Sequence, residues 1–401
     1  MTSKRLYMDN AATSFPKPPE VLAAMNHYAT SIGASAGRGA YEEAMQSAGA
    51  LAECRRRLQR LFNGEKAEHF IFTLNCSDSL NLAIKGLVLH QLQHGKGGGH
   101  AICSDIDHNS ILRPLNSMQD MGWVSQTRLP IDPITGLLDP EAVRKAIRPD
   151  TKLIAVTHAS NVTGTLQPIR EIGRIARDHE IPFVVDAAQS VGHIAIDVQA
   201  DCIDLMAAPG HKGLLGPLGT GVLYVRPGIE RIVATLKEGG TGSVSEQDTH
   251  PQFMPDKYES GSHNAIGLAG LSAGVQWILD RGIESLAQHD RLLVKTFVDA
   301  MKDAPGVRYF GPQGVENRTG VFSVRIGDLT PHELATILEM QYGILTRPGI
   351  HCAPRAHESI GTTPFGGTTR LSFGAFVTPA DVQRAVAALA EIAQQCAVAK
   401  R

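Results

Sequence analysis

Short apolar segments alternate with longer amphipathic stretches through the first two thirds of this 401-residue chain. The apolar segments, each predicted as a strand, are His69–Thr73, Ala101–Cys103, Leu153–Val156, Phe183–Val185, Ile203–Met206 and Gly221–Val225. The amphipathic stretches, predicted as helices, include Leu80–Leu92, Asn109–Met121 and Ile169–Glu180. Strands that are apolar on both faces and separated by helices predict an α/β fold, in which a mostly parallel sheet lies between helical layers.

The pattern changes after about residue 280. A long helix, an alternating strand and two further helices are predicted there, at Ile283–Lys302, Gly320–Ile326, Pro331–Gln341 and Pro379–Ala399. A chain of this length usually exceeds one hydrophobic core. We therefore expect two domains, a large α/β domain over residues 15–280 and a smaller α+β domain formed by residues 1–14 and 281–401.

Composition and charge narrow the class of partner. Hydrophobic residues make up 43% of the chain and charged residues 19%, and the formal net charge is −2. This balance is typical of a globular protein and argues against nucleic acid or an anionic membrane as a partner. No apolar run approaches the length of a membrane span, and the polar start Met1–Tyr7 does not resemble a signal peptide. Six cysteines without a CxxC pair favour reduced thiols, so we expect a cytoplasmic protein.

Ligands of open α/β sheets bind beyond the carboxyl ends of the strands, which makes the residues after each strand candidates for chemistry. Asp186 directly follows the strand Phe183–Val185. A carboxylate there needs a cation or several donors, and capping a helix is its structural alternative. Its functional alternative is to pair with a protonated ring nitrogen, the arrangement that makes pyridoxal phosphate (PLP) an electron sink.

A lysine follows the next strand, in the sequence Gly210-His211-Lys212-Gly213. Most lysines are solvated surface residues, but the flanking glycines and apolar surroundings argue against a solvated position here. A desolvated lysine has a lowered pKa and can form a Schiff base. The order of Asp186 and Lys212 along the chain therefore predicts a PLP site.

Such a site also needs a phosphate cradle, which a helix N-terminus supplies through its free N–H groups. The turn Asn75-Cys76-Ser77 precedes the first predicted helix, and its small and hydroxyl residues suit a phosphate and plain helix capping equally. The glycine-rich run Gly95–Gly99 precedes a strand instead, and we interpret it as a flexible turn.

Two polar residues, His108 and Asn161, occupy turns after further strands. A lone histidine or a turn asparagine is structural by default. In the same cleft, His108 could stack on a cofactor ring and transfer protons, and Asn161 could contact the cofactor or the substrate.

One cysteine stands apart from the other five. Cys352 lies in the segment Arg347–Pro354, whose two prolines and glycine predict a loop without regular structure. The neighbouring Arg347 and His351 favour the thiolate, which is the reactive form. The alternatives are a chance loop cysteine and a zinc site from His351, Cys352 and His357, which lacks the regular four-ligand spacing; we expect no metal.

An arginine, Arg370, lies in the short strand Thr369–Phe373. A cation among apolar neighbours attracts a carboxylate, and the planar guanidinium binds one in bidentate fashion. An amino-acid substrate carries such a carboxylate.

Together these segments resemble the class V aminotransferase-fold enzymes, specifically the cysteine desulfurase and selenocysteine lyase group. The resemblance covers nearly the whole chain, through the motifs Tyr7–Thr13, Asp186–Ser190, Gly210–Gly213, Arg347–Ala353 and Arg370–Phe373. It implies the fold type I of PLP-dependent transferases, with PLP as cofactor. The implied reaction converts L-cysteine to L-alanine and transfers the sulfur to Cys352 as a persulfide.

The resemblance also implies roles for single residues. Lys212 would form the Schiff base with PLP, Asp186 would pair with the ring nitrogen, Gln189 would reach the ring hydroxyl, and His108 would stack on the ring as a catalytic residue. The phosphate would be surrounded by Cys76, Ser77, His211 and, from the second subunit of a homodimer, Ser262. The substrate would be held by Asn161, Arg370 and Asn10.

Two positions depart from the family pattern. Pro209 occupies the place of a hydroxyl residue that contacts the phosphate, and Asn75-Cys76-Ser77 replaces the usual Gly-Thr-Thr turn. Both changes bear on the affinity for the cofactor, and neither touches the lysine, the aspartate or the nucleophile.

Other functions remain open at this stage. A selenocysteine lyase, or an epimerase, β-lyase or transaminase of the same fold, would keep the PLP site and act on another substrate. A non-catalytic sulfur-relay scaffold would keep the fold alone. The sequence does not name the sulfur acceptor, for which a partner protein is one candidate.

Overall fold

A seven-stranded sheet forms the centre of the computed structural model, which describes residues 5–37 and 39–399. The strands are β2 (Phe70–Thr73), β3 (His100–Ser104), β4 (Ser125–Leu129), β5 (Thr151–Thr157), β6 (Phe183–Asp186), β7 (Leu205–Pro209) and β8 (Gly221–Val225). Their order is β2-β8-β7-β6-β5-β3-β4. All neighbours from β7 to β4 are parallel, and only β8 runs against both of its neighbours. The predicted α/β fold with a mostly parallel sheet is confirmed.

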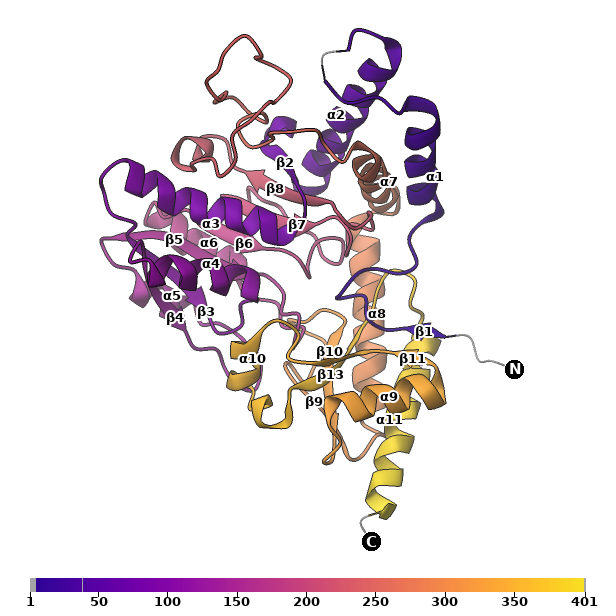
Figure 1. The fold of residues 1–401 in the computed structure, drawn as a ribbon. Helices are drawn as coiled ribbons and strands as arrows, with labels where there is room; N and C mark the ends of the chain where they lie inside the picture. The colour runs from indigo at the N-terminus through magenta and orange to yellow at the C-terminus, as the bar shows by residue number, and fades with distance from the viewer. Residues whose placement is uncertain (1–4, 38, 400–401) are drawn as a thin grey trace.

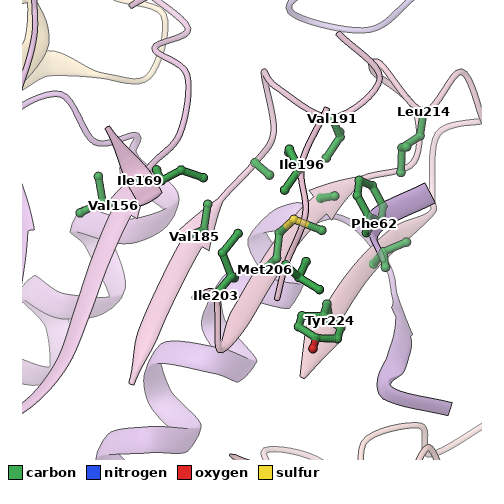
Figure 2. Packing of buried hydrophobic residues seen from close by; sticks show 14 of the residues in the cluster. Phe62, Val156, Ile169, Val185, Val191, Ile196, Ile203, Met206, Leu214 and Tyr224 are labelled. Carbon is green, nitrogen blue, oxygen red and sulfur yellow. The ribbon is translucent and has the colours of Figure 1, made fainter. Parts of the chain in front are cut away.

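Helices cover both faces of this sheet (Figure 1). On one face lie α3 (Cys76–Gln93) and α4 (Asn109–Asp120); on the other lie α2 (Glu42–Phe62), α5 (Pro140–Ala146), α6 (Ile169–Asp178) and α7 (Ala265–Arg281), and α1 (Pro19–His27) packs on α7. Leu205 and Met206 are adjacent in β7 but belong to two different core clusters, one on each face. Figure 2 shows the second of these clusters, in which Phe62, Met206 and Tyr224 lie close together. Burial of alternate side chains on opposite faces explains why these strands are apolar throughout.

A second, smaller body lies beyond the long helix α8 (Ile283–Met301) (Figure 1). Its antiparallel sheet has the order β12 (Arg347–Gly349), β13 (Thr368–Ser372), β10 (Val321–Ile326) and β9 (Val307–Tyr309), and its helices are α9 (Pro331–Tyr342) and α11 (Pro379–Ala399). The N-terminal strand β1 (Leu6–Tyr7) joins it by pairing with β11 (Ile344–Leu345). Leu6 and Met8 share a core cluster with residues from Leu293 to Ala393. We propose the division into domains 15–280 and 1–14 with 281–401 on this basis.

Several elements differ from the sequence prediction. The segment Arg347–Pro354 was expected to be irregular, but Arg347–Gly349 forms β12 and Pro354 begins the helix α10 (Pro354–Ser359). Both prolines are tolerated, because β12 is an edge strand and Pro354 occupies the first turn of its helix. The strand before the lysine loop begins at Leu205, two residues later than expected. Among residues 5–37 and 39–399, no helix combines the length and the apolar character that crossing a bilayer demands.

Two backbone turns touch next to Lys212. A Cβ atom added to Gly213 would lie 1.9 Å from the carbonyl oxygen of Val191, and one added to Gly192 would lie 2.0 Å from that of Gly213. A real side chain does not fit at these distances. The glycine after the lysine therefore allows the lysine loop to pack directly on the turn that follows β6.

Replacement of this glycine, Gly213→Ala, should lower the free energy of unfolding by about 1–3 kcal/mol, because the backbone has to move to accept the methyl group. Urea unfolding followed by circular dichroism measures the change. Gly49→Ala in α2 is the matched control, since its Cβ meets nothing within 4 Å and alanine favours a helix. Equal stability of the two variants would contradict the close-packing argument.

Candidate active site

The carboxyl ends of the strands meet at one edge of the large sheet. Thr157 ends β5, Asp186 ends β6 and Pro209 ends β7. The strand β2 points the same way, since it is separated from β7 by two antiparallel steps through β8. A cavity of about 250 Å³ opens at this edge. It has the position that ligand sites of α/β enzymes take.

Most of the predicted site residues line this cavity. They are Cys76, Ser77, His108, Asn161, Asp186, Gln189, His211 and Lys212. The lining also includes residues to which the sequence analysis assigned no role, namely Ser110, Thr157, Ala159 and Ala188. Pro209 also lines the cavity. It has no hydroxyl to offer the phosphate, at the place where the family pattern has a hydroxyl residue.

The Lys212 amine is buried near the Asp186 carboxylate. Burial lowers the pKa of the amine, and the negative charge of Asp186 acts in the opposite direction. A lowered pKa increases the fraction of neutral amine, which is the form that attacks a carbonyl carbon. The environment of Lys212 is therefore that of a reactive amine rather than a surface lysine.

Asp186 is buried, with 3% of its surface exposed. Its Oδ1 accepts the backbone N–H of Ala188 at 2.9 Å and the thiol of Cys76 at 3.6 Å. Burial raises the pKa of the Cys76 thiol well above its usual value, and Asp186 raises it further, so Cys76 stays a neutral donor. The sulfur of Cys76 thus faces the carboxylate, and the predicted place of Cys76 at the phosphate stays a prediction.

The N-terminus of α3 borders the cavity. Asn75 caps the helix, because its side-chain oxygen accepts the N–H of Asp78 at 3.0 Å. No helix carbonyl reaches the first-turn amides of Cys76 and Ser77. Capping and anion binding are thus compatible here, since the cap satisfies the third amide and leaves two for an anion at the positive pole of the helix.

His108 is held in one tautomer. Its Nδ1 accepts the backbone N–H of Ser110 at 3.1 Å and lies 2.9 Å from the Ser110 hydroxyl. An imidazole nitrogen that accepts an N–H carries no proton, which puts the proton of the neutral ring on Nε2. Burial lowers the pKa of His108 to about 4, partly opposed by Asp186. At neutral pH the ring is therefore an uncharged donor through Nε2.

The donor set of this cavity fits PLP. An amine, a buried carboxylate and a helix N-terminus are the partners that its aldehyde, ring nitrogen and phosphate require. Two polar atoms of the wall, Thr157 Oγ1 and His211 Nδ1, are buried and have no hydrogen-bond partner within the described residues. Such orphaned atoms in a cavity wall indicate a polar ligand.

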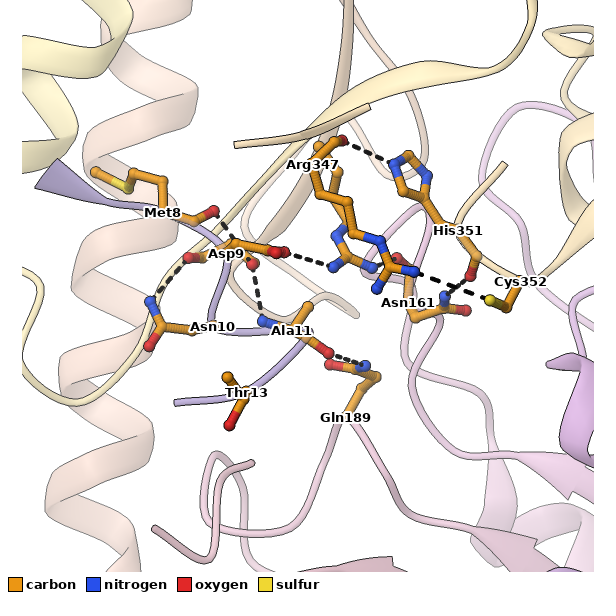
Figure 3. A network of polar contacts seen from close by, with 12 residues as sticks. Met8, Asp9, Asn10, Ala11, Thr13, Asn161, Gln189, Arg347, His351 and Cys352 are labelled. Atoms are coloured by element: carbon orange, nitrogen blue, oxygen red, sulfur yellow. Dashed lines mark hydrogen bonds and ion pairs between the residues drawn. The ribbon is translucent and has the colours of Figure 1, made fainter. Parts of the chain in front are cut away.

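Cys352 is exposed and lies on a left-handed turn, with φ of +53° at His351 and +60° at Cys352. The Cys352 carbonyl accepts the N–H of Asn109 at 2.9 Å, and the Arg347 guanidinium lies 3.9 Å from its sulfur (Figure 3). The side-chain amide of Asn161 donates to the carbonyl of His351. Loops at the edge of the large sheet therefore anchor the turn.

The hollow beside Cys352 adjoins the Lys212 cavity. Ser77, His108 and Ser110 line both spaces. These three residues thus form a wall with the Lys212 cavity on one side and the hollow beside Cys352 on the other.

Besides Cys352, three predicted residues lie outside the cavity lining. Arg370 is 1% exposed, and its guanidinium donates to Asp9 Oδ1 at 2.7 Å and to the Asn161 carbonyl at 3.1 Å. The side-chain nitrogen of Asn10 donates to the carbonyl of Ser372, and its side-chain oxygen accepts the N–H of Phe15. Both polar atoms of this amide are therefore bonded to the backbone. Ser262 is exposed elsewhere on this chain. The substrate and phosphate roles of these three residues stay predictions.

The zinc alternative is not supported by the geometry. His351 and His357 hydrogen-bond to each other at 3.2 Å, and their remaining ring nitrogens bond to the Arg347 carbonyl and to Thr362. Across the described part of the chain, no three His, Cys, Asp or Glu side chains are grouped to hold a metal ion.

Fold and site together define a PLP-dependent enzyme of fold type I. The chain belongs to the class V aminotransferase family, since the family profile described as "Aminotransferase class-V" matches residues 6–385. This family is PLP-dependent, and PLP is the cofactor of the chain. The predicted fold and family are confirmed.

Named relatives resemble the chain over nearly its full length. A "Probable cysteine desulfurase" of Methanothermobacter thermautotrophicus is 33% identical over 97% of this chain and 94% of its own. The apo structure of a cysteine desulfurase from Thermococcus onnurineus NA1 superposes with a TM-score of 0.90 at 31% identity, covering 98% of this chain and 95% of the other. The cysteine desulfurase CsdA from Escherichia coli gives a TM-score of 0.84 at 27% identity, with the same coverage.

The buried His158, next to the cavity, predicts how the free energy of unfolding changes at acidic pH. Burial lowers the pKa of His158 to about 4, against about 6.5 in an unfolded chain. Between these two pKa values the unfolded state binds a proton and the folded state does not. The contribution of neutral His158 to the free energy of unfolding is therefore fully present above pH 6.5 and is lost as the pH falls through about 4. Replacement by His158→Gln should reduce the slope of unfolding free energy against pH by about one proton in this window.

Urea unfolding at a series of pH values measures this slope. The matched control is His27→Gln, because His27 is exposed on α1. Equal slopes for wild type and His158→Gln would mean that His158 is protonated in the folded protein.

Proposed function

We propose that this protein is a PLP-dependent cysteine desulfurase, which converts L-cysteine to L-alanine and takes the sulfur onto Cys352 as a persulfide. The observation that carries the proposal is the position of Cys352. An exposed thiol, fixed by a left-handed turn, shares the wall residues Ser77, His108 and Ser110 with the cavity of Lys212. A nucleophile in that position suits sulfur transfer from a substrate held at the amine.

The cofactor would be held by this chain at three points. Lys212 would bind it covalently, Asp186 would accept a hydrogen bond from its ring nitrogen, and the amides of Cys76 and Ser77 would receive its phosphate. When bound, PLP supplies an electron sink that stabilises negative charge on the α-carbon of an amino acid.

Proton movement would depend on Lys212 and His108. Lys212 has a lowered pKa, which suits an amine that removes the α-proton of the substrate and later returns a proton. His108 stays neutral at working pH and can donate a hydrogen bond only through Nε2. Its donor geometry is therefore fixed before substrate arrives.

Sulfur transfer would occur at Cys352. Its thiolate attacks the substrate sulfur, the bond between that sulfur and the substrate β-carbon breaks, and the electron pair stays with the carbon. Protonation then completes alanine, and the enzyme keeps a persulfide, so L-cysteine plus a thiol gives L-alanine plus a persulfide. The Arg347 guanidinium lies 3.9 Å from this sulfur and faces it as a donor.

The relatives support cysteine as the substrate. Proteins from three sources, matching this chain over at least 94% of their own length, carry the name cysteine desulfurase or probable cysteine desulfurase. We extend the proposal to a homodimer, in which Ser262 of the second subunit would contact the phosphate. We also propose a cytoplasmic location and a sulfur-acceptor protein that removes the persulfide.

Two substitutions separate the roles of the amine and the thiol. Cys352→Ala should keep the absorbance of bound PLP yet lose alanine formation from L-cysteine by at least about 10²-fold, because the nucleophile is gone. Lys212→Ala should lose both. Alanine and sulfide are measured after incubation with PLP and L-cysteine, and the persulfide is mapped to its peptide by mass spectrometry.

The matched control is Cys396→Ala, which removes a partly buried thiol on α11, packed against the core of the smaller body. It should keep full activity. Absence of alanine from any sulfur- or selenium-containing amino acid would reject the proposed function, and full activity of Cys352→Ala on the true substrate would indicate another reaction of the same fold.

A further inference from the structure

The turn that presents Cys352 rests on a chain of four hydrogen-bonded residues, Arg347, His351, His357 and Thr362. His351 Nε2 lies 2.9 Å from the Arg347 carbonyl, and His351 Nδ1 lies 3.2 Å from His357 Nε2. His357 Nδ1 lies 2.7 Å from the hydroxyl of Thr362. The chain thus runs from β12, which precedes the cysteine, to the residues that follow α10.

The chemistry of its first member fixes the direction of every bond. A carbonyl only accepts, so the Arg347 oxygen requires a proton on His351 Nε2. A neutral imidazole then accepts at Nδ1, which requires a proton on His357 Nε2. His357 Nδ1 accepts in turn, so the Thr362 hydroxyl donates to this nitrogen at 2.7 Å rather than to the His357 carbonyl, which lies 3.3 Å from the same oxygen.

Both rings are kept neutral. Burial lowers the pKa of His351 well below its usual value and that of His357 to about 4, and the positive charge of Arg370 lowers both further. His357 and Thr362 are fully buried, and His351 is 4% exposed. Water therefore cannot substitute for a lost partner without entering the core.

The chain bears directly on the left-handed turn. A non-glycine residue with positive φ is costly, and two in succession persist only where surrounding contacts hold them. His351 is the first of the two, and its ring is fixed by Arg347 and His357. Arg347 also places its guanidinium 3.9 Å from the Cys352 sulfur. Loosening the ring of His351 would therefore change both the turn and the charge beside the thiol.

We propose that His357 and Thr362 are positioning residues, which hold the neutral His351 ring in the Nε2–H form and thereby fix the Cys352 turn against Arg347. Neither residue lines the Lys212 cavity or the hollow beside Cys352. Their effect on reactivity passes through His351. The proposal rests on the proposed function only in taking Cys352 as the reactive thiol.

The test compares Thr362→Val with Thr362→Ser in the PLP-loaded enzyme. Valine has the shape of threonine without the donor, whereas serine keeps the hydroxyl. A second pair of variants replaces the imidazole of His357. His357→Leu leaves no donor at this place, whereas His357→Gln supplies an amide donor. The primary readout is the rate at which iodoacetamide alkylates Cys352, followed by mass spectrometry of its peptide. Unfolding temperature, PLP absorbance, kcat and KM for L-cysteine are measured in parallel.

Thr362→Val should slow alkylation of Cys352 and lower kcat by roughly tenfold, the size expected when one buried hydrogen bond is lost, with little change in KM or PLP absorbance. Because Cys352 is already exposed, slower alkylation would reflect the lost alignment with Arg347 rather than reduced access. Thr362→Ser should behave as wild type, and His357→Gln should retain more reactivity than His357→Leu.

Equal alkylation rates and kcat in Thr362→Val and Thr362→Ser would overturn the proposal. So would a Thr362→Val protein in which PLP absorbance and unfolding temperature fall together with reactivity, since that pattern marks a purely structural role. Alkylation needs no substrate turnover, so an enzyme inactive on cysteine still gives a decisive result here. Failure of the proposed function and failure of the positioning role are thus separately visible.

Discussion

A strand buried on both faces can offer polar side chains to a ligand only at its ends, and this constraint shapes the whole site. The sheet from β7 to β4 is parallel, so its carboxyl ends lie on one edge. Asp186 and Thr157 are last residues of their strands, and Lys212 follows the neighbouring strand closely. The mutual influence of the Lys212 amine and the Asp186 carboxylate is a direct result of strand order.

The fold and most of the cavity could be predicted because the information is local. Strands such as Phe183–Asp186 and Gly221–Val225 are short apolar runs, and the polar residue after each run is visible in the sequence. The strand β4 (Ser125–Leu129) was missed because it lies at the sheet edge, where all its residues but the last are at least partly exposed and the apolar run is absent. Element type was thus predictable wherever burial on both faces left a pattern.

Pairings between distant segments could not be predicted in the same way. Asp9 and Arg370 are 361 positions apart, and their ion pair at 2.7 Å depends on the N-terminal segment docking on the smaller body, where β1 pairs with β11 and Asp9 bridges to Ser372. A carboxylate partner for Arg370 was predicted from its apolar neighbours, but Asp9 could not be identified as that partner. The tautomer of His108 was equally hidden, because it depends on the placement of the Ser110 amide at the start of α4. The ion pair arises from a contact between distant segments, whereas the tautomer arises from a local contact that forms only because α4 begins directly after His108.

The segment around Cys352 pairs as a strand with the smaller body and packs its side chains on the larger one. Its strand β12 pairs with β13 of the small sheet, while Ala353 and Ala356 pack in the core of the large one. With Asn109 and Asn161 bonded to its backbone, the turn is tethered on both sides. Because the segment is fixed by these contacts, the Cys352 thiol can move only a short distance from the cavity wall. Under the proposed function, sulfur would leave only where it was received, and whatever carries it away would have to travel to the enzyme's surface.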